Sequence, residues 1–191
     1  MKILGFCGSL RKGSYNRMLL NAATRLAPDG VEFEIYDGLR ELPHFDQDFE
    51  KNQPEVVRDL KARVKAADGL LFVTPEYNHS IPGPLKNAID WLSRPSGDNS
   101  LASKSVAVFG CGGSTFGAVR MQIAFREILF SLSVDILPRL EVIVFRAQER
   151  FDSSGNLTDE VTIGVVKEAL ELLKDRIETA KEIRELRAAR V

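Results

Sequence analysis

Two short runs near the middle of the chain are apolar almost throughout, GLLFVT at residues 69–74 and SVAVFG at residues 105–110. A strand with one face in water alternates apolar and polar residues, so a run without alternation indicates a strand that is covered on both faces. A parallel sheet with helices on both sides provides that environment. The two runs therefore restrict the chain to an α/β fold with its sheet in the interior.

The rest of the chain continues this alternation of strands and helices. Five strands are predicted at residues 2–8, 31–37, 69–74, 105–110 and 141–145. Apolar residues at three- and four-residue steps predict helices at 16–26, 55–67 and 117–132, one that ends at 92, and one from about 159 to the end. The segment at 37–54 is irregular. Strands that alternate with helices at short spacing indicate βαβ units, so we expect one doubly wound domain over residues 1–191.

The last helix is longer than the sheet requires. Its apolar residues are expected to pack on the sheet up to about Ile177, and ETAKEIRELRAAR at 178–190 is expected to project further. The charged residues between the apolar ones are typical of a solvated face.

Composition excludes several classes of protein. The chain has 191 residues, 44% hydrophobic and 28% charged, with a net charge of −1, so neither a disordered chain nor a basic nucleic-acid binder is indicated. No apolar run approaches a membrane span or a signal peptide, so we expect a cytoplasmic protein. Cys7 and Cys111 give no disulfide framework, and the only histidines are His44 and His79, so no metal site is expected.

A doubly wound sheet also predicts where a ligand binds. Ligands lie beyond the carboxyl ends of the strands, where the strand order reverses. The loops after the first, third and fourth strands are therefore the candidates, and these three loops have unusual compositions.

The first of these loops, GSLRKGSYN at 8–16, favours an anion. Polar side chains are concentrated before the next helix: Ser9, Arg11, Ser14 and Asn16. A helix N-terminus with free N–H groups suits a phosphate, although Ser14 or Asn16 could equally serve only as an N-cap. The Walker spacing and the GxGxxG arrangement are absent, and Asp37 is only a weak candidate for a ribose contact, so a mononucleotide is favoured over a dinucleotide.

The second loop belongs to PEYNHSIPGPLKNAIDW at 75–91. Pro75 fixes its own φ and favours an extended Thr74, so Glu76, Tyr77 and Asn78 are presented on a stiff backbone. A stiff loop loses little entropy on binding, which suits the grip of a planar ring by its edge. The alternative is a helix start with packed prolines, an interpretation that fits the residues from Pro82 onward.

The third loop, GCGGSTFGAVRMQ at 110–122, begins with small residues. Gly112, Gly113 and Ser114 allow a backbone to approach a ligand closely, and a flexible turn into the next helix is the alternative. Arg120 could contact a substrate or an adjacent subunit.

Together, GSLRKGSYN and PEYNHSIPGPLKNAIDWLSR resemble the NADPH-dependent FMN reductase family, over nearly the whole chain. The family has the flavodoxin-like fold, a five-stranded parallel sheet in the order 2-1-3-4-5, and includes quinone, chromate and azo-compound reductases. The resemblance implies that the FMN phosphate and ribityl chain are held by Ser9, Arg11, Ser14, Tyr15, Asn16 and Arg17. It also implies that the flavin ring is lined by Pro75, Glu76, Tyr77 and Asn78, with Ser80 and the glycine loop nearby.

The same resemblance implies an FMN-dependent NAD(P)H oxidoreductase. Because no side-chain catalytic set emerges from the sequence, we expect flavin N5 to carry the chemistry, with hydride passing from NAD(P)H to small acceptors such as quinones, free flavins or chromate. Two alternatives stay open, a flavodoxin-type electron carrier and a non-catalytic FMN-binding protein. A homodimer or homotetramer is expected.

Overall fold

The structure of the protein, a computed structural model, describes residues 1–138 and 141–189. It contains the five predicted helices and the predicted strands, with ends that differ by at most two residues at most boundaries. The strands are β1 Lys2–Cys7, β2 Glu32–Tyr36, β3 Gly69–Thr74, β4 Ser105–Cys111, β5 Asp135–Ile136 and β6 Val142–Val144. The α-helices are α1 Tyr15–Arg25, α2 Glu55–Ala66, α3 Gly83–Leu92, α4 Val119–Ser131 and α5 Glu160–Ala188. The short 3-10 helices are η1 Gly38–Arg40, η2 Gln47–Asn52 and η3 Ala147–Glu149.

The sheet is parallel, and its strand order β2-β1-β3-β4-β5 confirms the predicted order. The fifth position differs from the prediction because two short strands share it. β5 pairs with Ser105 and Val106 at the start of β4, whereas β6 pairs with Phe109–Cys111 at its end. The predicted strand at 141–145 corresponds to β6, and β5 was not predicted.

The side chain of Gln122 closes the gap that this split leaves. Gln122 is fully buried, and its Nε2 donates a hydrogen bond of 2.7 Å to the carbonyl oxygen of Val108. Val108 lies between the segments of β4 that pair with β5 and with β6. Because a buried carbonyl without a donor is costly, the amide replaces a bond that a continuous fifth strand would have made.

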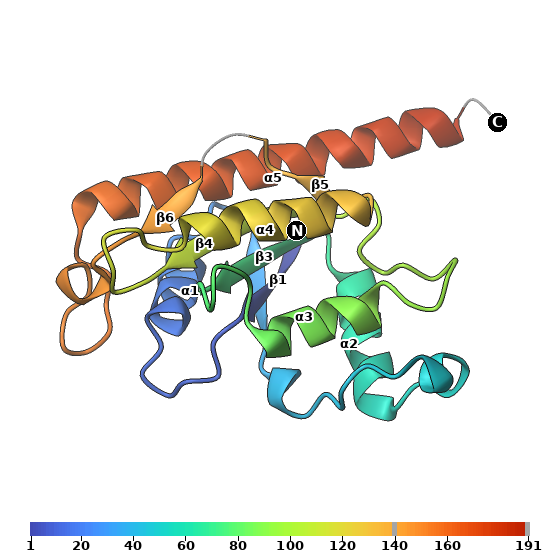
Figure 1. The fold of residues 1–191 in the computed structure, drawn as a ribbon. Helices are drawn as coiled ribbons and strands as arrows, with labels where there is room; N and C mark the ends of the chain where they lie inside the picture. Colours follow the sequence, from blue (N-terminus) through green and yellow to red (C-terminus); the bar gives the residue numbers. More distant parts are fainter. Residues whose placement is uncertain (139–140, 190–191) are drawn as a thin grey trace.

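The apolar strands separate two cores, one on each face of the sheet. In β3, Leu70 and Phe72 pack in the core with α2, α3 and α4, whereas Leu71 and Val73 pack in the core with α1 and α5. Figure 1 shows the same layers, with α1 and α5 on one side of the sheet and α2, α3 and α4 on the other. The absence of alternation in the central strands therefore has the predicted cause.

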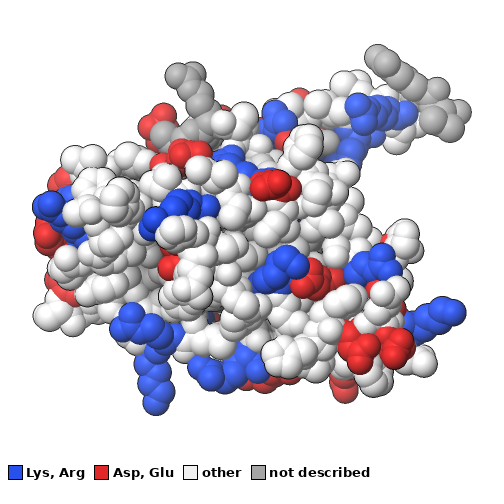
Figure 2. Space-filling view, viewed as in Figure 1, with Lys and Arg blue, Asp and Glu red and all other residues white. Residues whose placement is uncertain are grey.

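The last helix extends past the sheet, as Figure 1 shows. Ile177 is its last buried residue, and from Glu178 to Ala189 the residues are exposed except for a half-buried Ala180. This confirms the expected projection for the described part; Arg190 lies outside the described residues. No helix among the described residues is long and apolar enough to span a membrane. On the face drawn in Figure 2, charges of both signs are interspersed.

Candidate active site

The three unusual loops converge at the carboxyl edge of the sheet and line one cavity of about 270 Å³. The cavity brings together eleven of the thirteen predicted site residues: Ser9, Arg11, Ser14, Tyr15, Asn16, Pro75, Glu76, Tyr77, Gly112, Gly113 and Ser114. Another cavity, of about 360 Å³, lies elsewhere, between β6 and the start of α5.

The first loop is held by a close approach between β1 and β3. The N–H of Gly8 donates a 2.9 Å bond to the carbonyl oxygen of Val73, and a Cβ at Gly8 would lie 2.6 Å from the Cβ of Thr74. Only glycine fits there, so this position brings the first loop against the end of β3. Beyond it, Ser14 is the N-cap of α1, and its Oγ accepts from the N–H of Arg17 at 3.3 Å.

Asn16 connects the first loop to the third. Its Nδ2 donates to the carbonyl oxygen of Cys111 at 2.9 Å, and its Oδ1 accepts from the N–H of Cys111 at 3.1 Å. The side chain is buried, so the pair fixes the start of α1 to the end of β4. Tyr15, the residue before Asn16, also lines the cavity and stacks on Phe151 with ring centroids 5.9 Å apart.

The second loop contains a tight turn. The N–H of Tyr77 and the N–H of Ser80 each donate 3.0 Å bonds to the carbonyl oxygen of the other residue. Asn78 and His79, between them, have positive φ angles of 49° and 65°, the pattern of a type I′ turn. Pro75 is buried below the turn and Tyr77 is 45% exposed above it. The stiffness predicted for this loop therefore comes from the turn as well as from the prolines.

Glu76 connects the second loop to α4. Its carboxylate accepts from the backbone N–H of Arg120 at 2.9 Å and from Arg120 Nε at 2.6 Å. The N-cap residue of α4, Ala118, has no side chain that can cap, so Glu76 supplies the cap from another segment. Negative charge at a helix N-terminus is favourable, and the carboxylate side chain is only 8% exposed.

The third loop leaves β4 with its backbone bonded to the last residue of β6 and to the segment that follows it. The N–H of Gly112 donates to the carbonyl oxygen of Val144 at 2.9 Å, and the N–H of Arg146 donates to that of Ser114 at 3.0 Å. A Cβ at Gly112 would lie 2.7 Å from the carbonyl oxygen of Gly117, so the loop closes more tightly than other residues allow. Gly117 has a positive φ of 57°.

Two predicted residues lie outside the cavity. Arg17 forms an ion pair with Asp37 and lines a neighbouring cavity of about 250 Å³, which shares Ser9 and Arg11 with the site. Asn78 lies in the exposed turn of the second loop. Conversely, Cys111 and Gly117 line the cavity without having been assigned to it. A glycine at the end of the small-residue loop was the available signal for Gly117.

Thiol and metal chemistry have no visible basis at this site. Burial raises the pKa of Cys111 to about 12, so its thiol stays protonated at neutral pH. Among residues 1–138 and 141–189, no group of three or more His, Cys, Asp or Glu side chains is arranged to hold a metal ion. The site instead contains hydroxyl groups, a guanidinium group, a helix N-terminus and a glycine-containing backbone segment that a ligand can approach closely.

Comparison with known proteins agrees with this geometry. The model of the NADPH-dependent FMN reductase family matches residues 1–149. An NAD(P)H:quinone oxidoreductase of Solanum tuberosum is 46% identical over 169 residues, 85% of each chain. An NAD(P)H-dependent FMN reductase of Pseudomonas aeruginosa is 39% identical over 175 residues, 91% of this chain and 94% of the other.

A solved structure extends the agreement to the fold. FerB, a flavoenzyme NAD(P)H:(acceptor) oxidoreductase from Paracoccus denitrificans, superposes with a TM-score of 0.86 at 34% identity, over 94% of this chain and 98% of the other. The fold is therefore flavodoxin-like. The chain belongs to the NADPH-dependent FMN reductase family and is an oxidoreductase with FMN as cofactor and NAD(P)H as co-substrate.

Proposed function

We propose that the protein binds one FMN in the cavity of the three loops and reduces quinones with NAD(P)H, with free flavins and metal oxyanions such as chromate as further acceptors. The observation that carries the proposal is the convergence of the three loops on one cavity at the carboxyl edge of the sheet. When bound, FMN supplies a ring that accepts hydride from NAD(P)H and passes reducing equivalents on.

The first loop fits the phosphate. Ser9 and Ser14 offer hydroxyls, and Arg11, exposed at the cavity, has no acidic partner among the described residues. The first N–H groups of α1, those of Tyr15 and Asn16, precede any intrahelical acceptor and point out of the helix N-terminus. These donors and the helix dipole together suit a dianion.

Asn16 and Arg17 support the phosphate site less directly. The amide of Asn16 is bonded to Cys111, so it aligns the first and third loops around the ligand. The ion pair of Arg17 with Asp37 keeps a cation beside the first loop. We assign both residues to positioning, with the phosphate contacts on Ser9, Arg11 and Ser14.

The second and third loops fit a flat ring. Pro75 and Tyr77 of the second loop line the cavity together with Gly112, Gly113 and Ser114 of the third. The side chain of Glu76 is engaged with α4, so its backbone is the part available to the ring. Asn78 holds the turn that presents Tyr77. A rigid site of this kind places a ring with little loss of entropy.

Two observations support small planar acceptors. The cavity is open, with Tyr77 and Ser114 exposed at its rim, so an acceptor can reach a bound ring. The potato relative is named for quinone reduction and the Pseudomonas relative for FMN reduction. Because no side-chain acid has to match a particular substrate, we expect several acceptors to be reduced.

We further propose a single FMN-binding domain that acts in the cytoplasm as a homodimer or homotetramer. The outer face of α4 supports association, because Ile123 is 64% exposed and Phe130 is 82% exposed, with Phe116 at 66% just before the helix. Large apolar side chains gathered on one face favour contact with another protein surface. Light scattering that shows a monomer at micromolar concentration would contradict this part.

The test starts with an absorbance spectrum after incubation with FMN and gel filtration. We expect a bound flavin, bleaching on anaerobic addition of NADH or NADPH, and oxidation of the nicotinamide with a quinone, free FMN or chromate. Bound flavin without nicotinamide oxidation would indicate an electron carrier or a non-catalytic binder instead. A protein that retains no FMN contradicts the proposal altogether.

A further inference from the structure

The first loop borders two cavities. Besides the site cavity, it lines a second one of about 250 Å³, and Ser9 and Arg11 belong to the lining of both. The rest of this second cavity, which we call the adjoining cavity, is formed mainly by residues 36–41, at the end of β2 and just after it. Each cavity alone is smaller than a typical ligand pocket of roughly 300–1,000 Å³. Because they share residues of the first loop, a single ligand can extend from one into the other.

The adjoining cavity is rich in cations. Its charged lining residues are four basic and two acidic ones: Arg11, Lys12, Arg17, Arg40, Asp37 and Glu41. Arg17 is paired with Asp37, and Nη2 of Arg40 donates to the carbonyl oxygen of Leu10 at 2.9 Å. A guanidinium has five N–H donors, so Arg40 keeps others for a ligand, and Lys12 is exposed. The cavity therefore provides two cations, Lys12 and Arg40, for a second anionic group beside the flavin phosphate.

Asp37 occupies a position that suits a ribose. It directly follows β2, which pairs with β1. In doubly wound folds that bind dinucleotides, an acidic side chain at this place accepts hydrogen bonds from the hydroxyls of the adenosine ribose. The side chain of Asp37 is 69% exposed, and its Oδ1 is paired with Arg17, so Oδ2 remains as an acceptor. Because the GxGxxG arrangement is absent, a second phosphate depends on side chains rather than on a backbone cradle.

The same cavity has an apolar part. Leu10, Tyr36 and Leu39 line it, and Tyr36 and Leu39 are buried. Apolar and aromatic lining with a few polar groups is typical of sites for flat ligands, so these residues suit a nucleobase. Cations, an acidic acceptor and apolar surface are thus combined in one hollow next to the phosphate end of the flavin site.

We propose that the flavin site accepts FAD as well as FMN, with the second phosphate and the adenosine of FAD in the adjoining cavity. The second phosphate binds Lys12 and Arg40, and the ribose hydroxyls donate to Asp37. The adenine lies against the apolar part of the cavity. This inference rests on the proposed function, which places the flavin phosphate in the first loop.

The charges of the two flavins show what the adjoining cavity has to contribute. The phosphate monoester of FMN carries about two negative charges at neutral pH. The diphosphate of FAD distributes the same charge over two phosphates, so the first loop faces roughly one charge fewer. The affinity lost there is recovered only if cations of the adjoining cavity contact the second phosphate.

The adenosine half of NAD(P)H is not the ligand that this position indicates. The adjoining cavity shares Ser9 and Arg11 with the site, the residues assigned to the phosphate, and it has no residue of the second or third loop. A nicotinamide that reduces the flavin has to lie on the ring, which is assigned to those two loops. A ligand that continues from the flavin phosphate fits the place better.

The test is a calorimetric titration of the flavin-free full chain with FMN and with FAD. The quantity compared is the ratio of the FAD dissociation constant to that of FMN. We expect Lys12→Ala and Arg40→Ala each to raise this ratio by roughly 3- to 10-fold, as for an exposed charged contact. The ratio also corrects for the bond of Arg40 to Leu10, because a looser first loop weakens both flavins alike. Lys51→Ala is the matched control, since Lys51 is exposed and lines neither cavity, and it should keep the wild-type ratio.

The outcomes separate this inference from the proposed function. If FMN binds and FAD does not, or if neither substitution changes the ratio, the inference is overturned and the proposed function stands. If neither flavin binds, both are overturned. A higher KM for NADPH in Lys12→Ala, with an unchanged flavin ratio, would assign the cavity to the nicotinamide cofactor and also overturn the inference.

Discussion

Two loops of similar composition lie at opposite edges of the sheet. GSLRKGS at 8–14 follows β1, and RPSGDNS at 94–100 precedes β4. Each loop combines serines, glycine and at least one charged residue, so by composition alone either loop could bind a ligand. The structure gives them different roles, and the difference lies in where their polar groups find partners.

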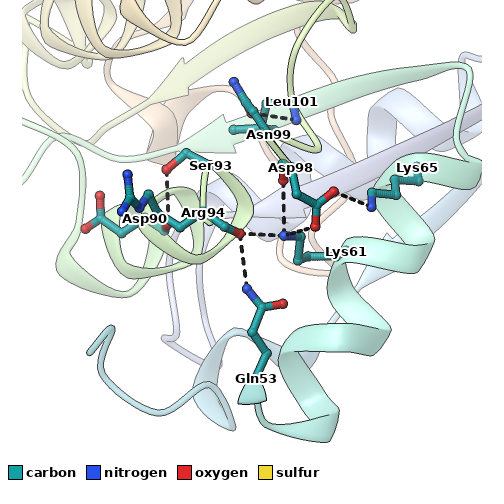
Figure 3. Close-up of polar contacts among 9 residues, drawn as sticks. All are labelled: Gln53, Lys61, Lys65, Asp90, Ser93, Arg94, Asp98, Asn99 and Leu101. Atoms are coloured by element: carbon teal, nitrogen blue, oxygen red, sulfur yellow. Dashed lines mark hydrogen bonds and ion pairs between the residues drawn. The ribbon is translucent and has the colours of Figure 1, made fainter. Parts of the chain in front are cut away.

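At the amino ends of the strands, Lys61 of α2 binds polar groups of the loop at 94–100. Lys61 of α2 is 4% exposed, and its Nζ donates to the carboxylate of Asp98 at 2.7 Å, to the carbonyl oxygen of Asp98 at 3.1 Å and to that of Arg94. Gln53 donates to the same Arg94 carbonyl, and Lys65 binds the other carboxylate oxygen of Asp98 (Figure 3). All three ammonium donors of Lys61 are therefore used within the chain.

At the carboxyl edge, the corresponding groups face the cavity. Arg11, Tyr77 and Ser114 are exposed there, and the side chains that are buried, such as Asn16, hold the loops together rather than fill the cavity. The comparison shows that strand direction, more than composition, decides which loop is free to bind. Substitutions can test this division, from the largest expected effect to the smallest.

Gly8→Ala should have the largest effect on the carboxyl edge. The new Cβ would overlap the side chain of Thr74, so the first loop and β3 must separate. We expect a loss of roughly 1–3 kcal/mol in the free energy of unfolding, as for overpacked cores, together with weaker FMN binding. Urea denaturation and FMN titration measure both. Gly13→Ala, whose Cβ meets nothing within 4 Å, is the control, and equal behaviour of the two variants would contradict the close approach.

Lys61→Met should destabilise the fold without affecting the ligand. The substitution removes the Lys61 donor from the Asp98 carbonyl oxygen and from one Asp98 carboxylate oxygen, and it leaves the Arg94 carbonyl with Gln53 as a donor; the loss costs roughly 1.5–3 kcal/mol for bonds to a charged group. Thermal melting should show the loss, while the FMN dissociation constant of the folded variant stays at the wild-type value. A large change in FMN affinity would contradict the separation of the two edges.

Arg11→Ala should show the reverse pattern. Removal of a charge-assisted contact to phosphate should raise the FMN dissociation constant by roughly 10- to 100-fold, with the melting temperature of the FMN-free protein unchanged. Lys12→Ala, an equally exposed cation that does not line the site cavity, should change affinity far less. If both variants bind FMN as the wild type does, the phosphate does not lie in the first loop.

Glu76→Gln tests the connection between the second loop and α4. The amide keeps the shape but loses the charge at the helix N-terminus, so we expect about 1 kcal/mol lower stability and a few-fold weaker FMN binding. Asp90→Asn removes an exposed pair with Lys86 and should cost well under 1 kcal/mol. Equal losses in these two variants would show that Glu76 has no special role.

The smallest effect concerns pH. Lys61, followed by Lys65, holds the pKa of Asp98 below its ordinary value. A depressed carboxyl pKa contributes stability above the unfolded value, near pH 4, and this contribution is lost as pH falls through the folded value. Asp98→Asn should therefore be less stable than wild type at pH 7, and the difference should shrink as the pH falls through the lowered pKa of Asp98. A pH-independent difference would show that the charge of Asp98 does not matter.

The sequence predicted the sheet well because its central strands are covered on both faces and contain few polar residues. The fifth position was harder, since β5 has only two residues, Asp135 and Ile136, and depends on pairing with Ser105 and Val106 at the start of β4. A bond such as Gln122 to the Val108 carbonyl leaves no periodic pattern in the chain.

For the site, the sequence predicted which loops meet, but not which side chains bond to other parts of the protein and which remain free to contact a ligand. Asn16, Glu76 and Arg17 are polar residues in the expected loops, yet their side chains bond to Cys111, Arg120 and Asp37. These partners lie 20 to 95 residues away, so only the folded chain shows which polar groups remain available. Composition identifies candidate binding residues, and the hydrogen bonds and ion pairs formed in the fold show which of them remain available to a ligand.

The most direct test is a crystal structure of the purified protein with FMN. We predict that the phosphate lies within hydrogen-bond distance of Ser9, Arg11 and Ser14, and that the ring lies between the Pro75–Tyr77 segment and the Gly112–Ser114 segment. FMN found in the cavity beside β6 and α5, or at any site without contact to all three loops, would contradict the account.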